Sequence, residues 1–184
     1  MATVIIRPSS TTSQAGWAAD PINTAADNNT STGVAQDNTT CDWTAVLADL
    51  DAGLSSATIN SFTISANAKA GRAGACQAVM SLIHSTDGIF VSEHESWTGT
   101  QSTQTTSAIN KQQDGNSALT FSYINNCSVK IDPNTQGMTL YELFVTVDYT
   151  LPTGYGNDIM GVATASIGKV NGVATASINK VSGV

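Results

Sequence analysis

Hydrophobic and polar residues alternate along much of the chain, and this alternation predicts strands. The clearest case runs over 139–149. One face of that run holds Leu143, Val145, Val147 and Tyr149, and the other holds Glu142, Phe144, Thr146 and Asp148. Shorter runs predict further strands at 3–7, 59–66, 75–83, 88–92, 118–124 and 127–131. Pro8 closes the first of these runs, so we expect it at the edge of a sheet.

Two regions do not follow this alternation. Apolar residues in 42–50 recur at spacings of three and four, and Asp42 and Gly53 suit the start and stop of a helix of about two turns. A strand entering the sheet is the alternative, and the residues leave both open. Residues 9–40 are rich in Ser, Thr, Asn, Asp and Gly, so we expect a long irregular connection with at most one short strand.

The order of these elements predicts an all-β fold, an antiparallel β-sandwich of jelly-roll-like type. The chain has 184 residues, 41% of them hydrophobic, which suits one well-buried core. Proline and glycines after Leu151 indicate the end of that core. We therefore predict a sandwich domain at 1–152, a linker at 153–160 and a tail at 161–184.

The tail is an internal repeat, because nine of eleven residues agree between 161–171 and 172–182. Apolar residues spaced 4-4-3-4-4-3 fit a helix with an eleven-residue period. In the alternative, Asn171-Gly172 turns a β-hairpin that places Val170 opposite Val173. The glycines and β-branched residues favour the hairpin. In either form we expect an assembly interface formed by Ile159, Ala163, Ile167, Val170, Ala174, Ile178 and Val181.

Charge and targeting signals exclude several function classes. The net charge is −7, and no basic cluster suggests a nucleic-acid partner. Residues 159–184 contain two lysines and no acid, so 1–158, with five basic and fourteen acidic residues, carries −9. No apolar run is long enough for a membrane span, and the first residues lack a secretory signal, so we expect a protein kept in the cytoplasm where it is made.

Candidate chemistry is sparse. Three separated cysteines predict buried thiols, with neither a disulfide framework nor a zinc site. His84, Asp87 and His94, with Glu93 or Glu95, could form a metal or acid–base cluster. The alternative is a turn at Asp87-Gly88 with the glutamates on a solvated edge, which we favour because the spacing matches no zinc signature. We expect no catalytic residues and no cofactor.

The tryptophans offer a second kind of site. Trp17, Trp43 and Trp97 could form a platform on which sugar rings stack, and we take Trp17 and Trp97 as candidate glycan contacts. Aromatic residues make up only 6% of the chain, so a role in the core is the favoured alternative.

The end of the chain resembles virion structural proteins of tailed bacteriophages, in which Lys-Val-Asn-Gly-Val-Ala repeats recur at C-termini. The resemblance is carried by Ile159-Met160-Gly161-Val162-Ala163 and the tandem Ile-x-Lys-Val-x-Gly-Val units after them. It implies a capsid decoration, head-fibre or tail-appendage component located in the virion and assembled in the host cytoplasm. It also implies copies of the same chain and major capsid or tail proteins as partners.

Two functional hypotheses follow. The first is a non-enzymatic virion structural protein attached through its C-terminal repeat. The alternative is a receptor or carbohydrate-binding β-sandwich module of a phage tail or head fibre, with a host-surface glycan as its ligand. A hydrolase centred on His84 and Glu93 is the least favoured reading.

Overall fold

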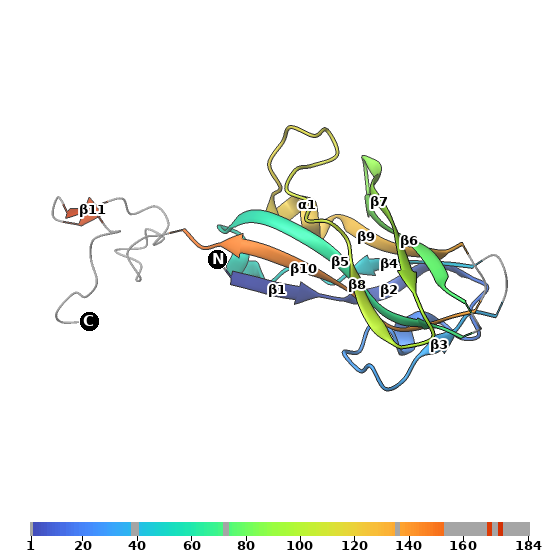
Figure 1. The fold of residues 1–184 in the computed structure, drawn as a ribbon. Helices are drawn as coiled ribbons and strands as arrows, with labels where there is room; N and C mark the ends of the chain where they lie inside the picture. Colours follow the sequence, from blue (N-terminus) through green and yellow to red (C-terminus); the bar gives the residue numbers. More distant parts are fainter. Residues whose placement is uncertain are drawn as a thin grey trace.

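The computed structural model describes residues 2–37, 41–71, 74–134 and 137–152, together with the backbone of 169–170 and 173–174 in the tail. Two antiparallel sheets pack face to face (Figure 1). No helix in these ranges is both long and apolar enough to cross a membrane.

The first sheet, sheet A, has the order β1-β10-β5-β8, and β3 also pairs with β10. Its strands are β1 (Ala2–Ile6), β3 (Val34–Ala35), β5 (Thr58–Ala70), β8 (Ser102–Thr105) and β10 (Met138–Thr150).

The second sheet, sheet B, has the order β2-β4-β9-β6-β7. Its strands are β2 (Pro8–Ala15), β4 (Asp42–Leu47), β6 (Cys76–His84), β7 (Gly88–Trp97) and β9 (Cys127–Pro133). Except for the β6–β7 hairpin, each strand from β1 to β10 lies in the other sheet from the strand before it. This repeated crossing is typical of jelly-roll sandwiches, and the predicted all-β antiparallel sandwich is confirmed.

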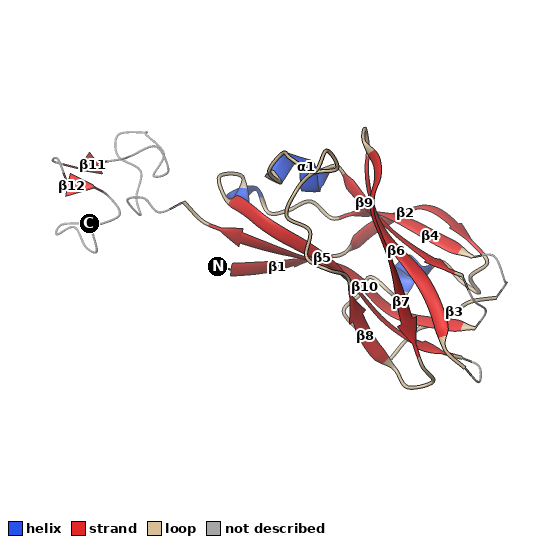
Figure 2. Cartoon of the chain, turned by 45° about the horizontal axis from the view of Figure 1, so that its top comes forward, coloured by secondary structure: helices blue, strands red, loops and turns tan. Residues whose placement is uncertain are grey.

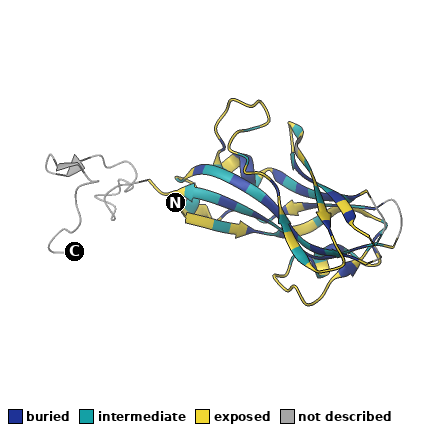
Figure 3. Cartoon of the chain, viewed as in Figure 1, coloured by how far each residue is buried: buried dark blue, intermediate teal, exposed yellow. Residues whose placement is uncertain are grey.

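The core lies between the two sheets, and strands of both sheets carry buried residues (Figure 3). Alternate residues of each strand point into it, as in β9, where Val129 and Ile131 are fully buried between half-exposed neighbours. Burying each such aliphatic side chain contributes about 1.5–3 kcal/mol. The largest buried side chains are Trp43, Trp97, Phe62, Ile64 and Met80.

The predictions for the two end strands are confirmed. β10 buries Leu143, Val145 and Val147 on one face, and Thr146 on the other is half-buried. A register shift between Leu140 and Glu142 interrupts its pairing with β5. β1 forms an edge of sheet A, as its short run before Pro8 predicts.

Three other predictions need correction. The helix considered at 42–50 is wrong: β4 lies between β2 and β9, and this pairing with two strands outweighs the helical spacing. The strand expected at 118–124 is instead the short helix α1 (Phe121–Asn125), begun by Thr120, whose side chain accepts from the Tyr123 N–H. The irregular connection expected at 9–40, with at most one short strand, holds two: β3 and all but the first residue of β2, which is polar and mostly exposed and so shows no alternation.

Short 3₁₀ turns complete the connections, at η1 (Pro21–Asn23) and η2 (Ala52–Leu54). Asp20 and Asp51 begin these turns, because each carboxylate accepts a backbone N–H two residues later.

In the tail, β11 (Lys169–Val170) pairs antiparallel with β12 (Val173–Ala174), with Val170 opposite Val173 (Figure 2). This is the register that the hairpin interpretation predicts, so the helical alternative is wrong for these four residues. The linker and the interface positions Ile159, Ala163, Ile167, Ile178 and Val181 lie outside the described residues. The assembly interface therefore stays a prediction.

Candidate functional site

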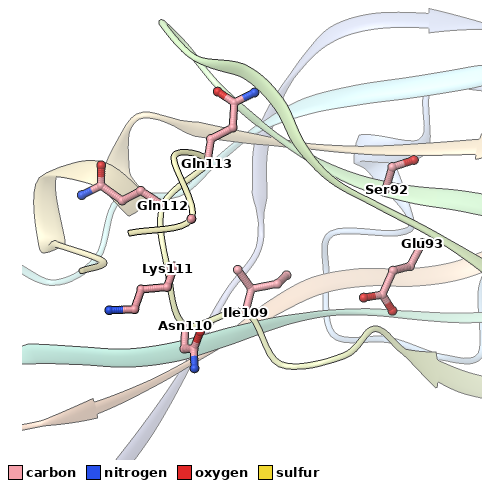
Figure 4. Close-up of a pocket in the computed structure, with 8 residues that line it drawn as sticks. Ser92, Glu93, Ile109, Asn110, Lys111, Gln112 and Gln113 are labelled. Atoms are coloured by element: carbon pink, nitrogen blue, oxygen red, sulfur yellow. The ribbon is translucent and has the colours of Figure 1, made fainter. Parts of the chain in front are cut away.

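A polar hollow of about 380 Å³ lies between β7 and the segment that follows β8. Ser92 and Glu93 line it from β7, and the segment contributes the other side (Figure 4). That side consists of Ile109, Asn110, Lys111, Gln112, Gln113 and Gly115. The hollow thus joins the edge of sheet B to a loop that comes from sheet A.

Sheet A holds the first part of this loop. Ile109 and Phe62 of β5 exchange both backbone hydrogen bonds, each 2.9 Å long. Thr106 donates its N–H to the Ile64 carbonyl over 3.0 Å, and its buried hydroxyl accepts from the Ile64 N–H over 3.1 Å. Because these contacts are made to a central strand, the start of the loop is fixed to the sandwich.

Sheet B and α1 hold the second part. The Gln113 side-chain Nε2 donates to the Ile89 carbonyl of β7 over 3.1 Å, and the Gln113 backbone N–H donates to the Tyr123 hydroxyl over 3.3 Å. Glu93 accepts the Ser107 N–H at Oε2 over 2.8 Å. The loop is therefore tied to both sheets, and the hollow is a feature of the folded domain.

The tip of the loop is a tight turn stabilised by Asp114. Its carboxylate accepts the N–H groups of Asn116 and Ser117 over 2.9 and 2.7 Å, and also the Ser117 hydroxyl. The hydrogen bonds from Ser117 are the largest cause that lowers the Asp114 pKa. Gly115 follows with a φ of +72°, a left-handed conformation that favours glycine.

Charges near the hollow are few and of both signs. Glu93 and Lys111 line it, and Glu95 lies two residues further along β7, on the same side of the strand as Glu93. Burial raises the Glu95 pKa, and the neighbouring Glu93 raises it further. The lining itself carries one carboxylate and one ammonium group, and its other polar side chains are neutral.

A second hollow of about 460 Å³ adjoins the first and shares Gln112 and Gln113 with it. Its other lining residues are Asp87 and Asp114. Beside Asp87, the His84 ring stacks on Tyr123 with centroids 4.0 Å apart and planes 4° apart. His84 Nδ1 lies 3.3 Å from Asp87 Oδ2, so this stack connects the β6–β7 turn to the helix under the loop.

The structure does not bring the predicted histidine cluster together. His84 lies opposite Gly88, while His94 lies opposite Val79, at the far part of the same hairpin. His94 is exposed and points to the other side of β7 from Glu93. In the described ranges no three His, Cys, Asp or Glu residues are placed to hold a metal ion. The turn of the favoured alternative, directly before Gly88 (φ +81°), is confirmed. Its solvated glutamates are not, because Glu93 and Glu95 are half-buried and Glu93 accepts the Ser107 N–H.

The predicted glycan contacts Trp17 and Trp97 are buried, with 7% and 0% of their surfaces exposed. The Trp97 indole donates to the Ser102 carbonyl over 3.1 Å. Trp43, also buried, donates to Thr11 Oγ1 over 3.0 Å. In this structure neither Trp17 nor Trp97 presents a ring face to a sugar, and the tryptophans serve the core, as the alternative interpretation expects.

The three cysteines are free and buried, as predicted. Burial raises the pKa values of Cys41 and Cys127 to about 12, so these thiols stay protonated and unreactive at neutral pH.

Sequence reasoning missed the hollow because its residues come from an irregular loop and one strand. The only local signal is the run Asn110-Lys111-Gln112-Gln113, which combines three amides with one ammonium group. Such a run resembles an ordinary solvated loop until the fold places it beside Ser92 and Glu93.

No protein-family model and no curated protein sequence matches the chain. The solved structures that align with it include two carbohydrate-binding modules. One is the C-terminal CBM6 of LamC, a marine laminarinase from Zobellia galactanivorans, with a TM-score of 0.47 and 10% identity over 79% of this chain and 98% of that chain. The other is a CBM4, with a TM-score of 0.28 and 15% identity over 65% of this chain and 74% of that chain. Neither similarity is high enough to support an argument, so the geometry of the described residues must identify the function.

Proposed function

We propose that the sandwich is a non-catalytic carbohydrate-binding module and that the hollow between β7 and the 109–115 loop is its binding site. The observation that carries this proposal is the lining, which is rich in neutral groups able to donate and accept hydrogen bonds. Asn110, Gln112 and Gln113 each carry an amide nitrogen and a carbonyl oxygen, and Ser92 carries a hydroxyl. The Gln112 and Gln113 nitrogens each give one hydrogen to a backbone carbonyl and keep a second. Sugar hydroxyl groups need partners of both kinds.

The charge of the lining supports a neutral ligand. Glu93 and Lys111 contribute opposite charges to this lining, and the carboxylates of Asp87 and Asp114 in the adjoining hollow disfavour phosphate. A carboxylate and an ammonium group also form strong hydrogen bonds to hydroxyls. A volume of about 380 Å³ lies near the lower end of the range for ligand pockets, about 300–1,000 Å³. The proposed ligand is therefore a short neutral glycan segment.

Binding should be weak at a single site. Ile109 is the apolar residue of the lining, and no aromatic ring is among the lining residues on which a sugar could stack. We expect a dissociation constant on the order of 1 mM, or about −4 kcal/mol. Such an affinity becomes useful when several copies bind one glycan surface together.

The experiment is a glycan array followed by NMR titration of the best ligand with the full chain. Asn110→Ala and Gln112→Ala should each weaken binding several-fold while the sandwich stays folded. Gln112 Nε2 also donates to the Ala118 carbonyl over 2.6 Å, so Asn110→Ala is the variant that should leave the loop itself unchanged. Gln14→Ala, which changes an exposed amide on β2 outside the lining, is the matched control and should bind like the original protein. Glycan binding that both pocket variants retain would reject this site.

A second proposal concerns the tail, for which the pairing of Lys169–Val170 with Val173–Ala174 is the supporting observation. We propose that the repeat is an attachment element through which the sandwich joins copies of itself or other virion proteins. The +2 charge of 159–184 against −9 for the rest of the chain favours such contacts. In this proposal the chain is a structural component of a virion that displays a glycan-binding domain.

The tail proposal is tested by deleting 161–184 and following incorporation into particles. We expect a folded sandwich that no longer enters the particle. Normal incorporation of the truncated chain would reject the attachment role and leave the glycan proposal untouched.

A further inference from the structure

The edge strands β1, β8, β2 and β7 differ in how they are protected against pairing with another chain. An edge strand exposes unpaired N–H and C=O groups, and proteins protect such edges with charge, proline, bulges or covering loops. In β2, Pro8 begins the strand, and two register shifts interrupt its pairing with β4. β8 is polar throughout, Ser-Thr-Gln-Thr, and with four residues it is one residue shorter than β1.

The edge strand β7 is protected by charge and by a loop. Glu93, His94 and Glu95 follow one another along it. The Gln113 side chain also occupies the Ile89 carbonyl with a 3.1 Å hydrogen bond. An incoming strand would have to displace this contact and lie beside two carboxylates.

In the part of the chain that the structure describes, β1 has none of these protections. Its sequence, Ala-Thr-Val-Ile-Ile, contains no charged residue, proline or glycine, and its pairing with β10 is unbroken from Ala2–Tyr149 to Ile6–Val145. Every second residue therefore points its N–H and C=O away from β10 toward the open side. Ile5, with 46% of its surface exposed, adds an apolar side chain to this edge.

We propose that the open edge of β1 binds the tail repeat of a second copy of this chain by strand addition. This rests on the proposed attachment role of the repeat and adds the surface that receives it. The repeat consists largely of Val, Ala, Thr, Ser and Ile, which suit a strand, and it contains no acidic residue. Its paired segments 169–170 and 173–174 form a two-stranded sheet, which is marginal alone and gains stability from a further strand.

The position of the tail supports this partner. β10 ends at Thr150, one residue after Tyr149 pairs with Ala2, so the chain leaves the domain beside the start of β1 (Figure 1). Leu151, 52% exposed, adds apolar surface at this exit. Within one chain, β11 and β12 form a sheet separate from sheet A. We therefore assign the strand that β1 receives to another copy.

The mode of binding predicts which change should block it. Val4 and Ile6 point toward the core, whereas Ile5 lies on the outer face of the edge strand. A lysine at position 5 would place a charge on the docking edge without entering the core, the device by which natural edge strands avoid pairing. Val46 is a matched control, because it is 39% exposed but lies on β4, which β2 and β9 flank on both sides.

The experiment measures the mass of the full chain by light scattering across a hundredfold range of concentration. The original protein and Val46→Lys should assemble alike and dissociate on dilution. Ile5→Lys should raise the concentration needed for assembly at least tenfold, and deletion of 161–184 should give monomers. Circular dichroism checks that each variant keeps its strands.

Two outcomes would overturn the proposal in different ways. A monomeric original protein at every concentration would reject assembly through the repeat. Ile5→Lys that assembles normally, while the truncated chain does not, would reject β1 as the receiving edge but keep the attachment role.

A second measurement does not depend on the folding of Ile5→Lys. Thr3→Cys and Thr175→Cys chains are mixed with a short thiol-reactive crosslinker. A mixed dimer is expected, and its absence would count against the proposed edge.

Discussion

Arg7 donates from Nη2 to Oε1 of Glu142 over 2.7 Å, although 135 residues separate them. Arg7 lies where the chain crosses from β1 to β2, and Glu142 lies where the pairing of β10 with β5 shifts. Arg7 also donates to Asn28 Oδ1 over 2.7 Å, and its guanidinium lies 5.7 Å from the centroid of the Phe144 ring. The pair therefore joins the first crossover between the sheets to the last strand.

Removal of one member of this pair should destabilise the domain. The Glu142 side chain is 8% exposed and that of Arg7 24%, so Arg7→Met leaves a largely buried carboxylate without its cation. Breaking a fully buried pair costs about 3–5 kcal/mol, and partial exposure of Arg7 should reduce this to about 2 kcal/mol. Urea unfolding measures the loss. The double variant Arg7→Met, Glu142→Leu should recover part of it, whereas a double variant less stable than both single ones would contradict this account.

Gly71→Ala should be strongly destabilising, because an added Cβ would lie 2.7 Å from the carbonyl oxygen of Gly137. A backbone oxygen in a sheet connection cannot move aside as a side chain can, so we expect a cost of about 1–3 kcal/mol. Gly99→Ala is the control, since an added Cβ there meets no atom within 4 Å. Thermal unfolding of the two variants should separate them clearly, and equal melting temperatures would refute the predicted clash.

Glu95→Gln should stabilise the protein at neutral pH and lose this effect in acid. Burial and the nearby Glu93 raise the pKa of Glu95 in the folded state, so folding favours its protonated form. The protonated form of Glu95 therefore stabilises the folded protein. This stabilisation is fully present below the pKa of Glu95 in the unfolded state and is lost as pH rises through its pKa in the folded state. Melting temperatures at pH 7 and at about pH 3, below the unfolded glutamate pKa near 4.3, measure the difference. If Glu95→Gln raises the melting temperature by the same amount at both pH values, the electrostatic cause is excluded.

Tyr123→Phe should loosen the pocket loop while the sandwich stays folded. The variant loses the hydroxyl, which accepts the Gln113 N–H and also interacts with the Asp87 carboxylate, but keeps a ring that can stack on His84. One neutral hydrogen bond contributes about 0.5–1.5 kcal/mol, so glycan binding should weaken about two- to tenfold. Faster hydrogen exchange at the Gln113 amide, with unchanged exchange in β10, would support this role. Unchanged exchange at Gln113 would show that other contacts hold the loop.

The strands with one buried face were predictable from the sequence. In β9 and in β10 from Leu143 to Val147, the two-residue alternation and the burial agree, because the core requires the apolar face that the sequence displays. Before Leu143 the register shift also buries Tyr141 and Glu142, which the alternation does not predict. The register of Val170 with Val173 was predictable for a different reason, since Asn171-Gly172 selects a two-residue hairpin.

Several elements could not be predicted because their state depends on distant partners. The apolar residues of β4 have the spacing of a helix. Its backbone N–H and C=O groups find their partners in β2 and β9, however, and this pairing requires β4 to be extended. β2 lacks apolar alternation, and its strand conformation comes from pairing with β4. The run at 118–124 has the composition of a strand, yet the Thr120 cap and the fold make its last part helical.

The sequence by itself determined the all-β sandwich, the antiparallel end strand and the repeat, because alternation, turn residues and self-similarity are local properties of the chain. Only the tertiary structure decided which polar residues meet. It buried Trp17 and Trp97 and separated His84 from His94. It also brought Gln112 and Gln113 beside Ser92 and Glu93. Hydrogen bonds between residues far apart in the sequence hold the loop against both sheets and so form the hollow.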